Sequence, residues 1–397
     1  MQFIVFVYHL FIGIIALNVL YWVFFAIAGR LGKADDTDQP AAPLVFRKIG
    51  VLIPAYKEDA VIVESVTENL KQTYPADRFE LIVIADSFQA HTLAQLAALP
   101  IKVLTVSFDV STVAKAINSA LARLPIEQYD ILVVSDADNH MAPDFLSRIN
   151  NAFEQGWRAI QGHRVAKNIN TSVAVLDAIS EEINNHIFRK ASRVLGLSSA
   201  TIGSGMAFEP ALMKAAMTTQ YTMGGYDKEL ETNIVLSGFK IGYLEQAYIY
   251  DEKVAQRAVF ENQRTRWIAA QWQFLKFYFW SGVRELLAGR FASGFKVIQA
   301  IILPKILLLG LLIAGLFIGL LTSKPVLWQL PLILLLLQMV SLVLSVPTYL
   351  WKRVSVKELL LIPVLLLSFV KALLNMRKAF KRFMHTPHTG SPDTQVP

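Results

Sequence analysis

Long apolar runs at both ends of the chain limit its fold more than any other feature. Residues 2–29 form one such run, and residues 297–321, 327–350 and 358–374 form three more. Each of the longer runs is sufficient to cross a bilayer, which takes roughly 20 residues. Because 54% of the 397 residues are hydrophobic, the chain is too apolar for an ordinary soluble protein. The sequence therefore predicts a membrane-embedded protein.

The first run predicts a retained transmembrane helix over residues 1–29. The letters AIA before Gly29 imitate a signal-peptide cleavage site, but no Lys or Arg precedes the run, and it is too long for a signal peptide. Basic residues follow it at positions 30, 33, 47 and 48. The positive-inside rule therefore predicts an integral inner or plasma membrane protein whose middle domain is cytoplasmic.

The C-terminal runs predict a membrane region over residues 297–376, followed by a basic, flexible tail over 377–397. Three full spans after a cytoplasmic domain would place this basic tail outside, against the positive-inside preference. Either the stretch 358–374, which Pro363 and Lys371 interrupt, is interfacial or re-entrant, or the rule fails here.

Composition also excludes several kinds of chemistry. The chain has no cysteine, which removes disulfides, thiolate catalysis and Cys-based zinc sites, and its seven histidines are not clustered as zinc ligands. The net charge of +7 does not predict nucleic-acid binding, because basic residues collect beside the apolar spans. That position favours contact with anionic lipid headgroups.

The middle of the chain, residues 45–255, has the mixed composition of a folded domain. Strand-like apolar runs at 49–56, 79–86 and 101–106 alternate with helix-like segments, and a fourth run begins at Ile131. This order is typical of an α/β fold with a mainly parallel sheet, which binds ligands beyond the carboxyl ends of its strands.

Polar side chains stand at those strand ends: Tyr56, Glu58, Asp86, Asp136 and Asp138. If the fourth strand continued through YDILVVSDAD, alternation would place both of its aspartates on the same side. The pair is then either an Asp-rich turn or a divalent-cation site that holds substrate phosphates. No dinucleotide fingerprint or P-loop is present.

Six motifs carry a resemblance to a known family: VLIPAYKE, VIADS, KAINSAL, VVSDAD, GGYDKELETNIVLSGFKIGYLEQAYIYDE and QRTRW. In this order and spacing they resemble membrane-embedded family 2 glycosyltransferases, a group that includes cellulose, hyaluronan and poly-N-acetylglucosamine synthases and lipid glycosyltransferases. The resemblance covers about residues 48–275. It implies a GT-A-like domain that moves a sugar, with inversion, from a nucleotide sugar, expected to be UDP-linked, to a growing polysaccharide. Transfer of a single sugar to a lipid is the alternative.

The resemblance also implies roles on the donor side. Asp138 is the expected ligand of Mg²⁺ or Mn²⁺, and Asp136 contacts the metal or the donor ribose. Lys115 matches a lysine near the donor, although a solvated helix lysine would look the same. The expected nucleoside pocket consists of Pro54, Tyr56, Glu58 and Asp86.

On the acceptor side, the resemblance makes Asp227 the base that takes the acceptor proton, with Glu231 in reserve. The family has another acid where this chain has Tyr226, and an aspartate that caps a helix would look the same as a base. A glycine-bearing loop, expected to lie beside the acceptor or to be a plain turn, contains Gly203, Ser204 and Gly205.

The motif QRTRW matches the family pattern through Gln263, Arg266 and Trp267. Arg can add positive charge at the diphosphate, and Trp offers a flat face for a sugar ring. The same stretch, within residues 256–296, also has the aromatic content of an amphipathic interfacial helix, and both interpretations can hold together.

Two non-enzymatic classes remain as alternatives, namely a transporter and a non-catalytic membrane scaffold. A transporter does not need an α/β domain with acids at its strand ends, and a scaffold would be expected to lose those acids. About four spans are few for the channel that processive polysaccharide synthesis requires. The sequence identifies no export partner.

Overall fold

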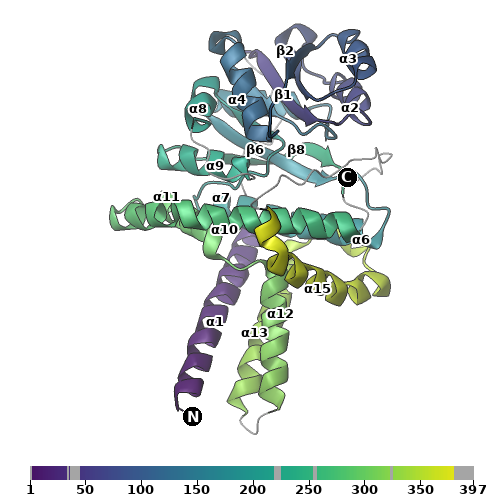
Figure 1. The fold of residues 1–397 in the computed structure, drawn as a ribbon. Coiled ribbons are helices and arrows are strands. Elements are labelled where there is room, and N and C mark those ends of the chain that lie inside the picture. Colours follow the sequence, from purple (N-terminus) through teal and green to yellow (C-terminus); the bar gives the residue numbers. More distant parts are fainter. Residues whose placement is uncertain are drawn as a thin grey trace.

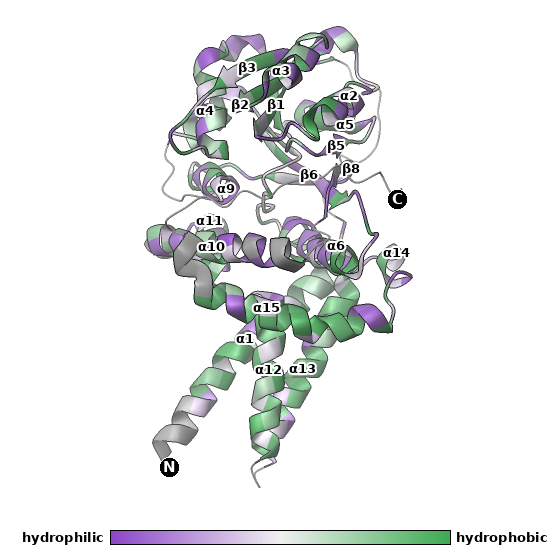
Figure 2. Ribbon diagram, turned by 45° about the vertical axis from the view of Figure 1, so that its right-hand side comes forward, coloured by the Kyte–Doolittle hydropathy of each residue, from purple (hydrophilic) through white to green (hydrophobic). Residues whose placement is uncertain are grey.

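The computed structural model describes residues 2–33, 35, 45–218, 225–253, 257–321 and 325–379. Figure 1 shows an α/β domain above a layer of helices that lie across the molecule, with α1 (Gln2–Leu31), α12 (Lys305–Leu320) and α13 (Val326–Ser345) projecting below. Figure 2 shows that these projecting helices are mostly hydrophobic.

One sheet forms the centre of the upper domain, with strand order β3-β2-β1-β4-β7-β6-β8-β5. The first four strands are parallel, β7 is antiparallel to both of its neighbours, β6 and β8 are parallel, and β5 is antiparallel to β8. The strands are β1 (Ile49–Tyr56), β2 (Phe79–Asp86), β3 (Lys102–Val106), β4 (Ile131–Val134), β5 (His140–Met141), β6 (Ala159–Ala166), β7 (Met206–Phe208) and β8 (Gly242–Asp251).

Apolar side chains on both faces explain why β1 and β2 are nearly continuous hydrophobic runs. Ile53 belongs to the core under one face, together with the helices α2 (Ile62–Asn69), α3 (Ala90–Ala97) and α5 (Phe145–Glu154). Leu52 belongs to the core under the other face, together with α4 (Val113–Arg123), α8 (Pro210–Ala216) and α9 (Tyr226–Leu236). The sheet is thus covered by helices on both sides.

A second group of helices joins the domain to the projecting helices. It comprises α6 (Ser172–Asn184), the π-helix η4 (Asn185–Ala191) and α7 (Ser192–Val194). Two short 3-10 helices, η2 (Ala76–Arg78) and η3 (Ile126–Gln128), lie elsewhere in the domain. Ile187 of η4 packs in one apolar core with Trp22 of α1 and Leu308 of α12. Close contact here requires glycine, because a Cβ at Gly29 would lie 2.7 Å from the ring of His186. The His186 ring nitrogen bonds to the Ala26 carbonyl at 2.9 Å.

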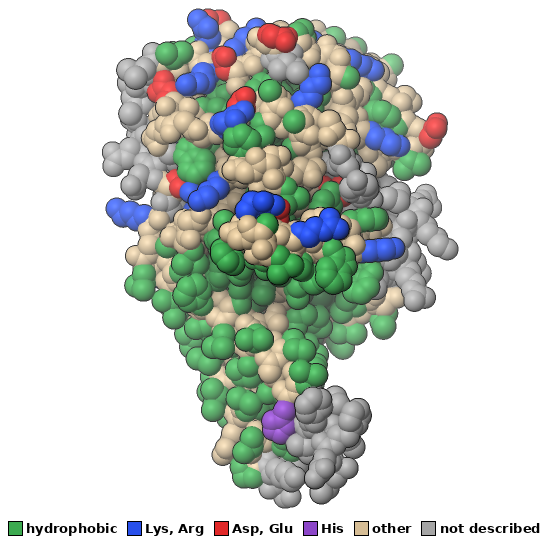
Figure 3. All heavy atoms as spheres, turned by 90° about the vertical axis from the view of Figure 1, so that its left-hand side faces the viewer, with side chains coloured by type: hydrophobic (Ala, Val, Ile, Leu, Met, Phe, Trp, Pro, Cys, Tyr) green, Lys and Arg blue, Asp and Glu red, His purple; other side chains and the backbone are tan. Residues whose placement is uncertain are grey.

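Two described helices are long and apolar enough to cross a membrane, Tyr8–Leu31 and Val326–Ser345. A third span results if Phe291–Ile301 and Lys305–Leu320, which are bent by 58°, are counted as one. On the face seen in Figure 3, Lys and Arg side chains gather along the boundary between the polar upper part and the apolar lower part. This distribution fits the expected contact with lipid headgroups.

The C-terminal helices begin and end at positions that differ from the expected apolar stretches. The stretch 297–321 is not one helix: α11 (Phe291–Ile298) and η5 (Gln299–Ile301) stop before Pro304, whose ring disfavours helix at the residue before it. The stretch 327–350 is likewise broken at Pro347, where α14 (Thr348–Trp351) begins.

The last helix, α15 (Val356–Ala379), runs obliquely beneath α10 (Arg257–Leu287) rather than alongside α12 and α13 (Figure 1). Glu261 of α10 accepts hydrogen bonds from Ser368 at 2.8 Å and from Lys371 at 2.9 Å. This orientation favours the interfacial alternative for 358–374. Most of the expected tail 377–397 lies outside the described residues.

Candidate active site

The strands β1 and β2 end side by side, with Tyr56 in register with Asp86. The residue that follows each strand adopts a left-handed backbone conformation: φ is 56° at Lys57 and 61° at Ser87. Such conformations are costly for residues other than glycine and cluster at functional sites. Asp86 is buried, and the Ser87 hydroxyl donates to its carboxylate at 2.9 Å.

The expected nucleoside pocket therefore comes together at one sheet edge. Pro54 lies within β1, Tyr56 is partly exposed at its end, and the Glu58 side chain is buried just beyond. Lys115 is placed differently: it is exposed on α4, and its ammonium donates to the Val110 carbonyl at 2.7 Å. The solvated-lysine interpretation accounts for this position without a donor contact.

The pair Asp136 and Asp138 does not lie in a strand, so the expectation from strand alternation was wrong. The strand β4 ends at Val134, and both aspartates belong to the turn that leads to β5. The Asp136 side chain is 35% exposed, whereas Asp138 is buried at 3%. The backbone N–H of Glu252 donates to the Asp138 carboxylate at 3.4 Å.

The glycine-bearing loop holds this turn in place through Ser204. The Ser204 hydroxyl accepts from the Asp136 backbone N–H at 3.0 Å and lies 2.7 Å from the Asn139 amide. With the amide oxygen toward that hydroxyl, the Asn139 NH₂ group donates to Asp138 at 3.1 Å and to Asp251 at 3.2 Å. The loop thus orients both aspartates of the turn.

Close approach of the loop to the sheet requires Gly205. Its φ is 68°, and a Cβ there would lie 2.7 Å from a methyl group of Ile249. Its N–H donates to the Val134 carbonyl at 2.8 Å, which ties the loop to the last residue of β4. The predicted loop is therefore built against the sheet rather than being a plain exposed turn.

Asp227 lies in the first turn of α9, after Gly225 with φ 83°. The Tyr226 hydroxyl donates to the Gly203 carbonyl at 2.7 Å, and a Cβ on Gly203 would lie 3.9 Å from the Asp227 carboxylate. Burial raises the pKa of Asp227 above its ordinary value, and the nearby Glu231 carboxylate adds to the rise. The structure thus brings the expected base and the acceptor-side loop together.

Glu231, the expected reserve base, is engaged elsewhere. Its side chain is 4% exposed and accepts from the Thr201 backbone N–H at 2.8 Å. Its other oxygen lies 3.2 Å from the Lys296 ammonium. These contacts give Glu231 a structural role and leave Asp227 as the better candidate for the base.

The QRTRW motif lies on α10, and its three matched residues are placed differently. Burial lowers the pKa of Arg266, whereas the carboxylates of Asp136 and Asp227 raise it. The Gln263 side-chain oxygen is buried without a hydrogen-bond partner among the described residues. Trp267 is 38% exposed, and its ring stacks under the Arg264 guanidinium at 4.2 Å. The charge of Arg266 is therefore influenced by the two aspartates, and Trp267 packs on its neighbour Arg264.

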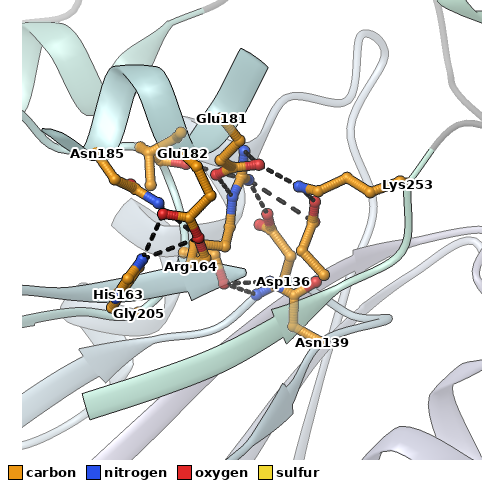
Figure 4. A network of polar contacts seen from close by, with 12 residues as sticks. Asp136, Asn139, His163, Arg164, Glu181, Glu182, Asn185, Gly205 and Lys253 are labelled. Carbon is orange, nitrogen blue, oxygen red and sulfur yellow. Dashed lines mark hydrogen bonds and ion pairs between the residues drawn. The ribbon is translucent and has the colours of Figure 1, made fainter. Parts of the chain in front are cut away.

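Sequence reasoning missed the buried ionic network around Arg164 of β6 (Figure 4). Its guanidinium donates to Glu181 at 2.7 Å and lies 3.7 Å from Asp251 and 3.9 Å from Asp136. Lys253 pairs with Glu181 and Asp251. Burial alone would raise the pKa of Glu181, but Arg164 and Lys253 hold it well below its usual range. The only signal in the sequence was an Arg within the short segment AIQGHRVA, which forms the largely buried strand β6.

Removing one partner of such a network leaves an uncompensated buried charge, at a cost of about 3–5 kcal/mol. Arg164 therefore fixes Asp136 of the turn relative to β8 and α6. Together the strand ends, the turn, the loop, Asp227 and Arg266 form one polar site at the carboxyl edge of the sheet.

The sequence profile described as glycosyltransferase-like family 2 matches residues 47–270, more than half of the chain. The chain belongs to this family. The profile match covers all of the site residues named above, and it confirms the predicted family. It does not separate polysaccharide synthases from lipid glycosyltransferases.

Two relatives are similar to this family 2 chain in sequence. The beta-monoglucosyldiacylglycerol synthase of Synechocystis sp. is 24% identical over 280 residues, which cover 65% of this chain and 58% of that protein. The probable glycosyltransferase YdaM of Bacillus subtilis is 25% identical over 242 residues, covering 58% of this chain and 57% of that protein. The chain thus spans less than three fifths of either relative.

The fold is similar to that of a solved structure, the mannosyltransferase PcManGT from Pyrobaculum calidifontis in complex with GDP-Man and Mn²⁺. The TM-score is 0.57 at 17% identity, and the likeness covers 84% of this chain and 97% of that one. Similarity at this identity shows a shared fold, and it confirms the predicted GT-A-like α/β architecture.

The carboxylates of the turn after β4 are the candidate ligands of a divalent cation in this family 2 site. No three His, Cys, Asp or Glu side chains are grouped to hold a metal ion in the part of the chain that the structure describes. Asp136 and Asp138 nevertheless offer hard carboxylate oxygens from a single turn. Mg²⁺ and Mn²⁺ sites in transferases commonly take one or two carboxylates and complete their shell with phosphate and water. The pair therefore fits a cation shared with a diphosphate.

Arg266→Ala is expected to lower the transfer rate strongly, by about 10²-fold, because a cation beside Asp136 and Asp227 is lost from the site. Trp267→Ala should have a smaller effect on the rate, since its ring faces Arg264. Its effect should be mainly on the acceptor KM, because the motif assigns this ring to a sugar. Steady-state kinetics of both variants test this, with the exposed Lys276→Ala on the same helix as control. Equal losses in all three variants would contradict a specific role for Arg266.

Proposed function

We propose that this protein transfers a single sugar, with inversion of configuration, from a nucleoside diphosphate sugar to a lipid acceptor in the membrane. The observation that carries the proposal is that Asp227 of α9 lies beside the acceptor-side loop, while the carboxylates of Asp136 and Asp227 both act on the charge of Arg266 on α10. The helix α9 lies between the sheet and α10, and α10 lies across the top of the projecting helices (Figure 1). The site thus has a donor side on the sheet and an acceptor side toward the membrane.

The donor side suits a nucleotide. The Tyr56 ring offers a stacking face, and the carboxylates of Glu58 and Asp86 offer acceptors for N–H groups of a base. A UDP-linked sugar is the expected donor. The complex of PcManGT with GDP-Man and Mn²⁺ supports a nucleoside diphosphate sugar as the donor class and a divalent cation beside it.

The proposed chemistry assigns one task to each group. Asp227, with its raised pKa, takes the proton from the acceptor hydroxyl as the new glycosidic bond forms, and the nucleoside diphosphate departs from the opposite side of the sugar. Arg266 faces the negative charge that grows on the diphosphate. A bound Mg²⁺ or Mn²⁺ would supply further positive charge at these phosphate oxygens. Arg164 holds Asp136 in position for this site.

The number of spans favours a lipid acceptor over a growing polysaccharide. The described residues contain two helices able to cross a membrane, or three with the bent pair, which is few for a polymer channel. The name of the Synechocystis relative, a glucosyldiacylglycerol synthase, supports the same class. Polysaccharide synthesis, which the initial resemblance favoured, is the second candidate.

The test is a screen of labelled nucleotide sugars, one at a time, with membranes that contain the full-length protein. The proposal predicts that one donor labels material that partitions into organic solvent and has the size of a lipid. Label in water-soluble material that grows in size with time would support the second candidate. No labelling with any donor, in the presence of Mn²⁺ and Mg²⁺, would contradict both.

A further inference from the structure

A buried ion pair connects the base-bearing helix α9 with α11. Glu231 of α9 and Lys296 of α11 are each 4% exposed, and their charged groups lie 3.2 Å apart. Burying two charges costs several kcal/mol per ion, and an apolar pair of the same volume often stabilises as well or better. Stability alone is therefore a weak reason for this pair, and its position suggests another.

At its upper end, the pair holds the acceptor-side loop. Glu231 accepts from the Thr201 backbone N–H at 2.8 Å, and the Thr201 hydroxyl lies 3.3 Å from the same carboxylate oxygen. That hydroxyl also donates to the Asp227 carbonyl at 2.9 Å. Thr201 comes two residues before Gly203, whose carbonyl accepts from Tyr226. Glu231 thus fixes the loop and the first turn of α9 relative to each other.

At its lower end, the pair is bound to the helices near the membrane. The Lys296 ammonium donates to the side-chain oxygen of Gln299 at 3.1 Å, and the Gln299 amide donates to the Tyr21 hydroxyl of α1. The Leu303 backbone N–H in the same break donates to Asn18 of α1 at 2.9 Å. A continuous set of polar contacts therefore runs from α1 through the break before α12 to the acceptor-side loop.

We propose that Lys296 is a positioning residue that sets the acceptor-side loop and Asp227 at a fixed height above the membrane helices. This inference rests on the proposed function, since it assumes an acceptor that arrives from the membrane. Lys296 contacts neither β1 nor β2, where the donor pocket lies, in any hydrogen bond or ion pair described for it. Its loss should therefore change acceptor use and leave donor binding intact.

The test compares the full-length wild type with Lys296→Met in lipid vesicles, using the donor that the wild type accepts. We expect the acceptor KM to rise about tenfold or more, the size of effect that coupled neighbours show. The donor Kd from calorimetry should stay within about twofold. An unchanged acceptor KM, or an equal loss of donor affinity, would overturn the proposal.

Two further variants separate positioning from folding. Lys296→Met combined with Glu231→Gln removes both charges, so stability should recover, and the new amide oxygen can still accept from Thr201. The link to α11 stays broken in this double variant, so the raised KM should persist. Lys296→Arg keeps the positive charge, so its acceptor KM should stay near that of the wild type. If the double variant regains both stability and normal KM, the pair is merely structural.

A matched control is the ion pair between Glu285, near the end of α10, and the exposed Arg290 just before α11. Glu285→Gln should leave the acceptor KM unchanged, and a rise there equal to that of Lys296→Met would overturn the proposal. A wild type that transfers no sugar refutes the proposed function itself. If the wild type transfers sugar and Lys296→Met has the same acceptor KM, only this inference is refuted.

Discussion

Asp227→Asn is expected to lower the rate of sugar transfer by about 10²–10⁴-fold, the usual contribution of a general base. The amide keeps the shape of the carboxylate but cannot take the acceptor proton. Donor binding should stay near that of the wild type, because Asp227 lies on α9 beside the acceptor-side loop. The measurement is single-turnover transfer with saturating donor, together with donor affinity by calorimetry.

Glu231→Gln is the matched comparison for this variant, since both acids lie one turn apart on α9. It should retain far more activity than Asp227→Asn. Glu231 is engaged with Thr201 and Lys296, so it is not expected to take the acceptor proton. The opposite pattern, with Asp227→Asn fully active and Glu231→Gln inactive, would exchange the two roles.

The pH dependence of the rate follows from the same carboxyl. Burial raises the pKa of Asp227, so its base form is lost at a higher pH than for an exposed aspartate. The transfer rate should therefore fall as the pH drops through that raised pKa, and the residual activity of Asp227→Asn should lack this fall. A pH profile of wild-type transfer that stays flat down to the ordinary range of an aspartate would contradict the assignment.

Removal of divalent cations, or loss of either aspartate of the turn, is the second change with a large expected effect. Chelation by EDTA, Asp136→Asn and Asp138→Asn should each lower transfer by several orders of magnitude, because the diphosphate leaving group then loses positive charge. Added Mn²⁺ or Mg²⁺ should restore the chelated wild type but not the variants. Transfer rates measured across a series of metal concentrations test this.

Of the two variants, Asp136→Asn should disturb the fold less. The Asp136 side chain is 35% exposed, whereas Asp138 is buried against Asn139. Asp77→Asn serves as the control, since this exposed acid lies before β2, at the opposite edge of the sheet. Full activity of the wild type in EDTA, or of Asp136→Asn and Asp138→Asn together, would rule out the metal role.

The parallel half of the sheet was predictable because its strands are encoded locally. The runs 49–56 and 79–86 became β1 and β2 with the expected bounds, since a strand buried on both faces needs apolar residues throughout. The same reasoning failed at YDILVVSDAD. The strand β4 pairs only as far as Val134, and contacts with Ser204 and Glu252 set the turn beyond it. No local pattern reports such distant partners.

In the candidate site, too, some residues could be predicted from the sequence and others could not. Asp227 and Arg266 could be placed by motif, and the carboxylates of Asp227 and Asp136 both act on the charge of Arg266. Arg164 could not, because its partners come from α6 and β8 and are far away in the sequence. The contacts of Glu231, the expected reserve base, could not be predicted either, since its partner Lys296 lies on a helix that sequence reasoning assigned to an interfacial segment.

The product of the purified, full-length protein tests the central claim most directly. After reaction in vesicles with its nucleotide sugar, the labelled lipid should be isolated and its mass and anomeric configuration determined by mass spectrometry and NMR. The account predicts one sugar per lipid, with an anomeric configuration opposite to that of the donor. A chain of sugars, a water-soluble product, or a retained configuration would contradict it.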